Sequence, residues 1–225
     1  MFGWTKENAQ TTARMVDATG AYDGAAVGAM TGLVAGTKVA TAIGWRPVEA
    51  VAEGDQVLTF DGGMQTVVRI QRKPLWNGTG PCPARFWPLE VPAEALGNRE
   101  TMYLLPEQGV VVESDAAEEF LGDPFALMPA AALDGVRGIA RVALMDQVEV
   151  ITLFFEEDQV VFANSGALFF CPSAHDIVVD LFKAPTVSNY SKLPMDQACA
   201  LAQYIEAEYE EFMEPAAQAP MYAVA

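Results

Sequence analysis

The segment that decides the fold spans residues 32–70 and reads GLVAGTKVATAIGWRPVEAVAEGDQVLTFDGGMQTVVRI. It contains three short runs rich in β-branched and apolar residues, KVATAI, QVLTF and QTVVRI. The turn-forming stretches IGW, EGD and DGG separate these runs, because glycine tolerates the positive φ that tight turns require. The segment therefore predicts a series of short, closely spaced β-strands.

The same pattern continues through the middle of the chain. Further strands are predicted at MYLL, GVVVES, VEVITLFF and QVVFA, so residues 37–168 are expected to be mainly β. The proline-rich stretch GPCPARFWPLEVP, residues 80–92, is predicted to be a long connection or an edge segment. Because proline removes ladder donors, we do not expect a central strand there.

Both ends of the chain predict helices. Residues 5–19 contain good helix formers and precede Gly20, which predicts a short helical arm. Residues 194–213 place apolar side chains at intervals of three and four, which predicts an amphipathic helix. Its apolar positions are Met195, Ala198, Ala202, Ile205, Tyr209 and Phe212.

Glutamates crowd the end of this second helix, at positions 206, 208, 210, 211 and 214. Negative charge at a helix C-terminus opposes the macrodipole, so these side chains are not expected to stabilise the helix itself. They either form a solvated face or meet a basic partner.

Four glycines recur every fourth residue before and within the opening segment, at positions 24, 28, 32 and 36. In a membrane helix this spacing would mark a dimer face, but the apolar stretch of residues 24–36 is too short to span a bilayer. We expect a tightly packed loop or strand lead-in. The alternative is a close-approach surface for a neighbouring subunit.

Composition narrows the class of protein. A chain of 225 residues with 52% hydrophobic residues can fill a sizeable core. Its net charge of −17, from 13 basic and 30 acidic side chains, disfavours nucleic acid and anionic membranes as partners. The excess of acid fits a secreted, periplasmic or salt-tolerant protein, or one that docks on a basic protein surface.

The N-terminus lacks the pattern of a secretory signal, and no apolar stretch is long enough to span a membrane. The sequence therefore does not identify the cellular compartment. We expect synthesis in the cytoplasm, followed by non-classical export or by incorporation into a particle. Cys82, Cys171 and Cys199 are too few for a disulfide framework and are expected to be reduced and mostly buried. With a single histidine, His175, no zinc-site spacing exists, and we predict neither a metal nor a cofactor.

Three blocks of the sequence resemble the Hint superfamily, the domains shared by Hedgehog autoprocessing modules and inteins, in its bacterial form. The first is Gly36–Thr37 with WRPVEAVAEGDQVLT, the second is YLLPEQGVVV, and the third is VEVITLFFEEDQVVFANSGALFFC. The resemblance implies a Hint-like β domain over residues 32–171. Residues 1–31 would then form an N-terminal arm and residues 172–225 a C-terminal extension that carries the helix.

The resemblance also indicates that the family chemistry is lost in the first two blocks. Hint domains begin with an acyl shift that needs a thiol or hydroxyl at their first residue, and Gly32 has neither. Their second block carries Thr-x-x-His, whose histidine protonates the scissile amide, and Leu105 and Gln108 occupy these places. Glutamine can donate a hydrogen bond but cannot shuttle a proton.

The third block departs from the family in the same way. Asp158 stands where a histidine usually does, and Phe169 and Phe170 replace the His-Asn pair whose asparagine would cyclise. Cys171 matches the downstream nucleophile and is the only retained nucleophile-like residue of the set. We expect it to be a core or edge residue.

Several alternative sites stay open at this stage. Thr31 or Cys171 could act as a nucleophile, and His175 could pair with Asp176 or Cys171 as a dyad. Two acidic stretches could bind Ca²⁺, although solvated turns are the simpler interpretation: Glu113, Asp115, Glu118 and Glu119, and Glu156, Glu157 and Asp158. A carbohydrate groove could be lined by Trp4, Trp45, Trp76, Phe86 and Trp87, although such residues more often fill a core.

The sequence thus predicts a catalytically inactive Hint-like domain, not an enzyme, that serves as a structural or binding platform for a protein partner or for self-assembly. One alternative is a structural subunit of a phage-like or extracellular, virion-like particle. Another is residual autoprocessing or a cysteine-dependent hydrolase or transferase activity.

Overall fold

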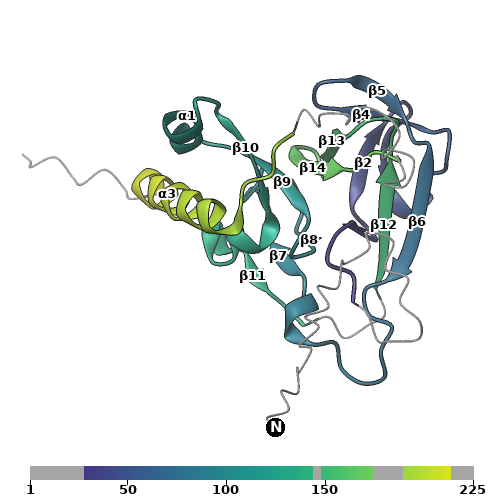
Figure 1. The fold of residues 1–225 in the computed structure, drawn as a ribbon, viewed down its shortest axis with the longest axis horizontal. Helices are drawn as coiled ribbons and strands as arrows, with labels where there is room; N and C mark the ends of the chain where they lie inside the picture. Colours follow the sequence, from purple (N-terminus) through teal and green to yellow (C-terminus); the bar gives the residue numbers. More distant parts are fainter. Residues whose placement is uncertain (1–27, 144–147, 175–189, 214–225) are drawn as a thin grey trace, which may run out of the picture.

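The computed structural model describes residues 28–143, 148–174 and 190–213, and these form two antiparallel sheets with two α-helices at one side (Figure 1). The six-stranded sheet has the order β11-β7-β8-β1-β12-β6. Its strands are β1 (Leu33–Val34), β6 (Arg69–Pro74), β7 (Leu89–Val91), β8 (Met102–Leu104), β11 (Ala140–Arg141) and β12 (Glu149–Phe154). The mainly β prediction is confirmed.

The eight-stranded sheet has the order β10-β9-β14-β13-β2-β4-β5, with β3 paired to β2 and an additional pairing between β13 and β4. Its strands are β2 (Lys38–Thr41), β3 (Gly44–Pro47), β4 (Gln56–Thr59), β5 (Gly63–Thr66), β9 (Gly109–Glu113), β10 (Phe125–Pro129), β13 (Gln159–Ala163) and β14 (Ala167–Cys171). Most predicted strands coincide with these elements.

The run QTVVRI is not one strand, as predicted, but the point where the chain changes sheet. Val67 is fully buried and its N–H donates to the carbonyl of Asp55, beside the eight-stranded sheet. The N–H of Val68 instead donates to the carbonyl of Phe154 in β12, which starts the six-stranded sheet. Two adjacent valines therefore end β5 and lead into β6.

The proline-rich segment contains a paired strand, so the prediction that it holds only a connection or an edge is wrong for residues 89–91. Strand β7 pairs with β8 on one side and with β11 on the other. Pro88 and Pro92 flank the strand, so the donors that proline removes lie outside its ladder. A short 3₁₀ helix, η2 (Ala84–Phe86), precedes it.

The stretch predicted to be an acidic turn is helix α1 (Asp115–Leu121). The hydroxyl of Ser114 accepts a hydrogen bond of 3.0 Å from the N–H of Ala117, which caps the first turn. Gly122 ends the helix with a φ of 75°, a left-handed conformation that glycine adopts without strain. Capping at both ends explains why this short segment is helical.

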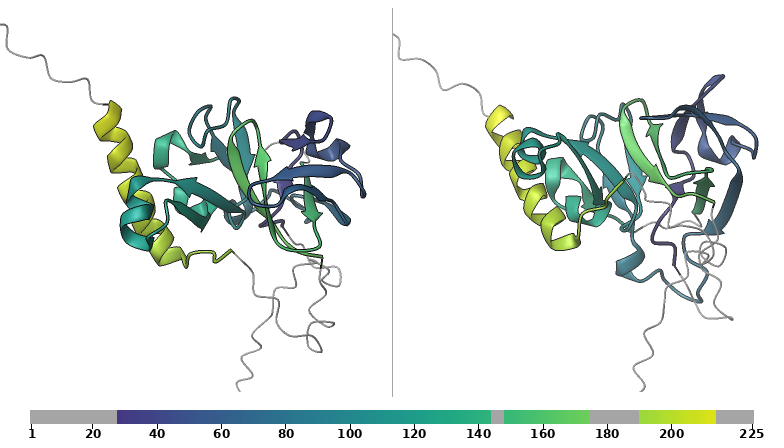
Figure 2. Two further views of the ribbon diagram at one scale, coloured as in Figure 1. Left: turned by 90° about the horizontal axis from the view of Figure 1, so that it is seen from above. Right: turned by 45° about the horizontal axis from the view of Figure 1, so that its top comes forward.

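The predicted C-terminal helix is present as α3 (Met195–Met213). Ala198, Leu201, Ala202 and Ile205 are buried and belong to the same hydrophobic core as both sheets. The helix packs against α1, β10 and the 3₁₀ helices η3 (Ala130–Leu133) and η4 (Val136–Gly138) (Figure 2). Within the described residues, neither helix is long and apolar enough to cross a bilayer.

Two of the glutamates near the end of α3 bind backbone amides of neighbouring elements. Glu206 accepts a hydrogen bond of 2.6 Å from the N–H of Arg137, and Glu208 accepts one of 2.9 Å from the N–H of Ala116. Ala116 lies in the first turn of α1, where a negative charge is favourable. These carboxylates therefore help to dock α3, a role that neither sequence interpretation of the acidic cluster included.

The glycine repeat is a tightly packed lead-in to β1 where the structure describes it. A Cβ at Gly28 would lie 2.3 Å from Cγ of Phe86, so the backbone passes directly against this ring. The close approach is thus made within the chain. The predicted helix over residues 5–19, like Gly24, lies outside the described residues.

Truncation of the buried face of α3 is expected to destabilise the whole domain. Ile205→Ala should lower the free energy of unfolding by about 2–5 kcal/mol, because it removes buried methyl and methylene groups and leaves a cavity. Gln203→Ala, at an exposed position of the same helix, should change it by no more than about 0.5 kcal/mol. Urea denaturation measures both values, and a separate early transition in Ile205→Ala would contradict a shared core.

Candidate functional site

Gly32 occupies a position with no space for a side chain. It precedes β1 and has a φ of 116°, a conformation that L-residues rarely adopt. A Cβ on this residue would lie 2.6 Å from Cγ1 of Val150 and 3.0 Å from Oγ1 of Thr152, both on β12. Gly32 thus carries no nucleophile, and side chains of the neighbouring strand β12 lie where a side chain of residue 32 would begin.

Gln108 joins this position to the last block of the domain. Its side chain is only 1% exposed, and its Oε1 accepts a hydrogen bond of 2.9 Å from the N–H of Gly32. Its Nε2 donates to the carbonyl of Phe170 at 2.8 Å and to that of Gly109 at 3.0 Å. The buried carboxamide of Gln108 therefore connects Gly32 with Phe170, and all three positions were identified in the sequence analysis.

The turn that carries Gln108 also holds the chain that leads into the site. The N–H of Gln108 donates to the carbonyl of Leu105, and the N–H of Glu107 donates to the carbonyl of Met30 at 2.7 Å. Thr31 is exposed, and its hydroxyl makes a long contact of 3.4 Å with Oε1 of Gln108. The chain on both sides of the Thr31–Gly32 peptide is thus fixed to one turn.

Leu105 acts in packing. It is fully buried in a small hydrophobic cluster that also contains Ala29, Val34, Leu75 and Val150. Val150 is also the residue whose side chain crowds Gly32. The leucine therefore supports the strand that closes the space beside the first residue.

Phe169 and Phe170, which correspond by sequence resemblance to a His-Asn pair, lie in β14. Phe169 is 1% exposed and lies in the main core. The ring of Phe170 packs edge-on against that of Tyr190, with centroids 6.1 Å apart. Neither ring can transfer a proton or cyclise, so what Phe170 contributes to the site is its backbone carbonyl.

Asp158 fixes the chain that follows the site. Its carboxylate accepts a hydrogen bond of 2.8 Å from the N–H of Ser173, two residues after Cys171. Asp158 also lines an open polar cavity of about 450 Å³ with Asp61, Glu156 and Glu157. Tyr190 also lines this cavity, and its hydroxyl donates a hydrogen bond of 2.6 Å to Asp61. Burial is the main cause that raises the pKa of Tyr190, and the hydrogen bond to Asp61 raises it further.

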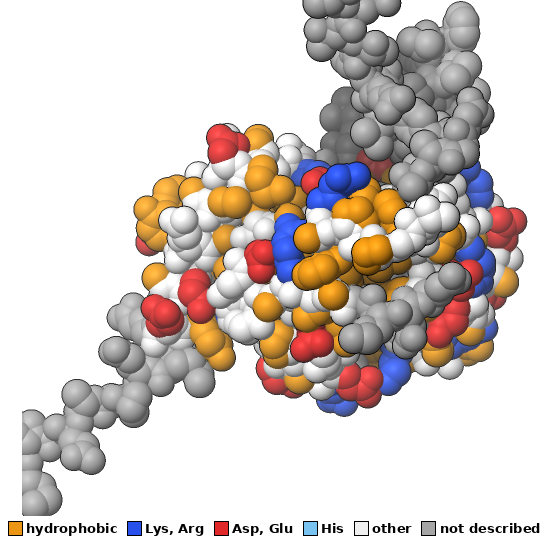
Figure 3. Space-filling model, turned by 90° about the horizontal axis from the view of Figure 1, so that it is seen from below, with side chains coloured by type: hydrophobic (Ala, Val, Ile, Leu, Met, Phe, Trp, Pro, Cys, Tyr) orange, Lys and Arg blue, Asp and Glu red, His pale blue; other side chains and the backbone are white. Residues whose placement is uncertain are grey.

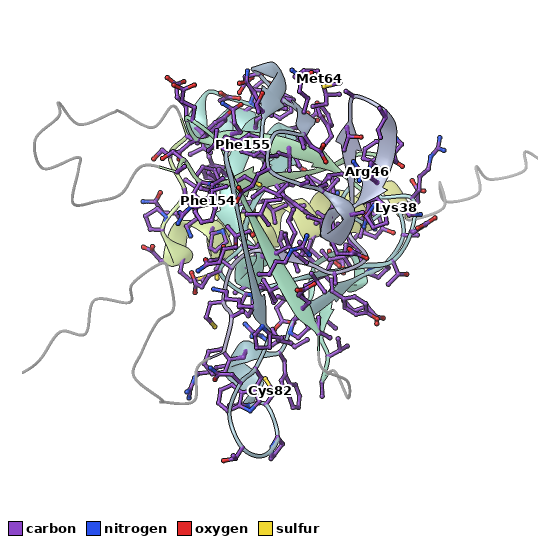
Figure 4. The ribbon with its side chains drawn as sticks, turned by 90° about the vertical axis from the view of Figure 1, so that its right-hand side faces the viewer. Lys38, Arg46, Met64, Cys82, Phe154 and Phe155 are labelled. Atoms are coloured by element: carbon purple, nitrogen blue, oxygen red, sulfur yellow. The ribbon has the colours of Figure 1, made fainter. Side chains whose placement is uncertain are left out.

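Cys171 is a poor nucleophile in this environment. It is 3% exposed, and burial raises the pKa of its thiol to about 12. The thiol is therefore protonated at neutral pH, and only the thiolate is a good nucleophile. All three cysteines are free thiols. Cys82 is half-buried and lies far from Phe155 in the view of Figure 4, and Cys199 is exposed. Only Cys171 therefore meets the prediction of burial.

The metal and carbohydrate sites considered from the sequence are not assembled in the part of the chain that the structure describes. Within the described ranges, no group of three or more Asp, Glu, His or Cys side chains is arranged to hold a metal ion. Trp76 packs on Phe86, with centroids 5.4 Å apart, and Trp87 donates to the carbonyl of Cys82, whereas Trp45 lies on β3 in the other sheet. His175, Asp176 and Trp4 lie outside the described residues.

Sequence reasoning did not identify Val150 and Thr152 as part of the site. Both residues belong to β12, which is distant from Gly32 in the sequence, so no local sequence pattern predicts their contact with Gly32. The hydrogen bond from Gln108 to the Phe170 carbonyl was also missed, because a backbone acceptor leaves no signature in the side-chain sequence.

Removal of the Gln108 carboxamide is expected to destabilise the domain strongly. Gln108→Leu leaves the Gly32 N–H and the Phe170 carbonyl without their partner, which should lower the free energy of unfolding by about 2–5 kcal/mol. Gln203→Leu, at an exposed position, serves as the matched control and should change it by about 0.5 kcal/mol or less. Equal effects of the two substitutions in urea denaturation would contradict the bridge.

Gln108→Glu is expected to add a pH dependence of known sign. The new carboxylate would keep the N–H of Gly32 as a donor, but its second oxygen would face the carbonyls of Gly109 and Phe170. Burial and these carbonyls should raise its pKa above the unfolded value, so the folded state binds the extra proton. The variant should therefore come closest to the wild type at about pH 4.5, and the gap should widen as the pH rises to about 8. A gap that narrows over this range in parallel denaturation curves would contradict the burial of this group.

Cys171 is expected to resist thiol labelling in the native protein. At pH 8, iodoacetamide should modify the exposed Cys199 at least about a hundredfold faster than the buried Cys171. Peptide mapping by mass spectrometry, with a sample denatured in urea as the control, measures both rates. Fast labelling of Cys171 in the native protein would count in favour of a reactive cysteine.

Solved structures with a related fold are found among inteins. They include a bacterial intein-like domain from Clostridium thermocellum (15% identity, TM-score 0.45, covering 63% of this chain and 99% of that one). They also include a splice-inactive variant of the AceL NrdHF class 3 split intein (14% identity, TM-score 0.42, covering 64% of this chain and 99% of that one). A third is the gp41-1 intein (14% identity, TM-score 0.37, covering 63% of this chain and 98% of that one). A search of curated proteins found no match.

The sequence itself carries the family assignment. The family model described as the Hint domain matches residues 31–168, which is more than half of the chain. This match covers the strands of both sheets from β1 to β13 and contains Gly32, Leu105, Gln108 and Asp158. The chain therefore belongs to the Hint domain family.

Proposed function

We propose that this Hint domain is catalytically inactive and serves as a structural or binding platform. The observation that carries the proposal is the environment of Gly32, where no nucleophile is present and where the side chains of Val150 and Thr152 fill the space beside the Cα atom. An N-to-S or N-to-O acyl shift needs a thiol or hydroxyl on the side chain of residue 32 itself, because the acyl group moves to that side chain from the nitrogen of the same residue.

The polarity of the hydrogen bond at Gly32 also opposes cleavage. Breaking the Thr31–Gly32 amide requires a group that delivers a proton to the departing nitrogen. The group that faces this nitrogen is the Oε1 of Gln108, which accepts a hydrogen bond from it and carries no proton to donate. The donor end of the carboxamide is already used by the carbonyls of Gly109 and Phe170.

The later steps of the family reaction lack their groups as well. Transfer to a downstream nucleophile would use Cys171, whose thiol is buried and protonated at neutral pH. Release by cyclisation would use an asparagine, and a phenylalanine ring at position 170 offers no amide nitrogen.

A platform role accords with what the fold retains. The polar groups of Gly32, Gln108 and Phe170 are paired with one another, and α3 packs into the same core as the sheets. One face of the molecule combines an apolar area with acidic and basic side chains around it (Figure 3). A rigid domain with such a surface can hold a protein partner or pack into an assembly.

Two alternative functions follow from the sequence, and experiments can distinguish them from an inactive platform. A subunit of a phage-like or extracellular particle would use the same inactive platform but would form large, regular assemblies in light scattering. Residual autoprocessing through Thr31 or Cys171 would produce fragments. The exposed Thr31 hydroxyl, which contacts Gln108, is the group that would have to act in that case.

The full-length protein is expected to keep its mass. Incubation of the purified chain with and without a thiol, followed by intact mass spectrometry, should yield no fragment ending near Gly32 or Cys171. Gly32→Cys should also stay intact, because its side chain would meet Val150 and Thr152 before it could reach the carbonyl. Thiol-dependent fragments from the wild type or from Gly32→Cys would refute the proposal.

A pair of glycine variants separates crowding from backbone strain. Gly32 and Gly36 both have a positive φ, of 116° and 92°, but a Cβ at Gly36 would meet no atom within 4 Å. Gly36→Ala should therefore lower the free energy of unfolding by about 1–2 kcal/mol from strain alone, and Gly32→Ala by at least about 1 kcal/mol more. Equal losses in urea denaturation would mean that the space beside Gly32 is open.

A further inference from the structure

We propose that the groove between α1 and α3 is a docking site for an amphipathic, Lys/Arg-bearing helix of a partner protein. This inference rests on the proposed platform function and names the class of partner. The groove has a volume of about 220 Å³, and its apolar lining is Phe120, Leu121, Leu193, Ala200, Leu201 and Tyr204. Helix α1 lies beside α3 at this place (Figure 2).

The groove exposes large apolar side chains that the fold has not buried. Phe120 is 59% exposed, Leu121 45% and Tyr204 51%. Large apolar side chains that gather at one exposed place mark interaction sites, whereas single ones are ordinary. The volume is smaller than that of ordinary small-molecule pockets, so it suits the anchoring side chains of a protein segment better than a free ligand.

The walls of the groove are held in place before any partner binds. The rings of Phe120 and Tyr204 contact each other with centroids 4.8 Å apart. Helix α1 is fixed by its Ser114 cap and by Glu208 of α3, and the opposite face of α3 is buried in the core. A preformed groove loses little conformational entropy on binding, which favours recognition of a helix.

The charge of the two helices selects the partner. Every charged residue of α1 and of α3 is acidic, and Glu118 and Glu119 directly precede Phe120. Among the residues that the structure describes, the lining of the groove itself contains no lysine or arginine; Lys192, next to Leu193 in the chain, points its Nζ to the carbonyl of Glu107. Lysines or arginines flanking an apolar stripe would therefore meet opposite charge on both sides.

The same charge disfavours the other occupants. Two copies of this chain in an isologous dimer would bring their acidic helices together. An anionic membrane would be repelled by the same side chains. A basic amphipathic helix satisfies both the apolar lining and the acidic border.

The test uses the full chain and three synthetic peptides as probes. The first is an amphipathic helix of about 15 leucines and lysines, the second has the same composition in scrambled order, and the third replaces lysine by glutamate. Isothermal titration calorimetry should detect one-to-one binding of the first peptide that weakens as salt rises, with the other two at least about tenfold weaker. Equal binding of the scrambled peptide would overturn the proposal.

Matched variants localise the binding. Phe120→Ala and Tyr204→Ala should each weaken it by about tenfold or more, whereas Met64→Ala, on β5 at the other side of the molecule, should not change it (Figure 1). Glu118→Gln/Glu119→Gln should weaken binding and reduce its salt dependence, and Glu156→Gln/Glu157→Gln, with the same change in net charge elsewhere, should not. Equal effects of the two double variants would mean general charge attraction and would overturn the site.

Two further results would contradict the choice of occupant. They are a dimer in light scattering that Phe120→Ala dissociates, and groove-dependent binding to zwitterionic vesicles. Failure of the peptide test with an intact full-length mass would remove the groove and leave the platform function standing. Fragments in the mass spectrum would remove the platform function whether or not the peptide binds.

Discussion

The structure depends on one buried carboxamide. Gln108 sits between β8 of the six-stranded sheet and β9 of the eight-stranded sheet, and it accepts from Gly32 and donates to Phe170. Gly32 leads into β1 of the first sheet, and Phe170 belongs to β14 of the second. The three blocks of the domain thus meet at a side chain that bridges the two sheets. Because the Gly32 N–H and the Gln108 carboxamide are buried and the Phe170 carbonyl is partly buried, loss of the bridge leaves polar atoms with little access to water.

By sequence resemblance, these positions correspond to those of the family chemistry, and our proposal of an inactive domain rests on their opposite properties. A reactive site needs space beside the first residue, a proton donor at the departing nitrogen and an ionisable nucleophile downstream. Here the space is filled by β12, the group at the nitrogen is an acceptor, and the thiol of Cys171 stays protonated. In the inactive domain that we propose, the contacts of Gln108 thus serve stability, because they pair polar groups of both sheets.

Much of the fold could be predicted from the sequence where local patterns agree with tertiary packing. The opening segment predicts the strands around its glycine turns, and the apolar spacing of residues 194–213 predicts α3. The resemblance also pointed to positions 32, 108 and 170, and the structure shows that Gln108 is hydrogen-bonded to the other two. Helix α1 was missed although Ser114 and Gly122 are the expected caps, because its many carboxylates favoured a metal-binding or solvated turn.

The remaining errors arise from long-range contacts. The division at Val67 and Val68 depends on which sheet each amide meets, and the pairing of β7 depends on partners on both sides of it. The crowding of Gly32 comes from β12, and the acceptor at Phe170 is a backbone atom. None of these features leaves a periodic signal in the local sequence. They follow only from the meeting of the two sheets.

Amide hydrogen exchange at Gly32, followed by nuclear magnetic resonance in the native protein, tests the central claim most directly. Gly36 offers an internal reference, because its N–H is bound to Glu49 at an exposed site. The account predicts that the Gly32 amide exchanges only with global unfolding, at the rate of the most protected strand amides. Exchange of Gly32 as fast as that of Gly36, with the strands still protected, would show that the junction opens by itself and would contradict the account.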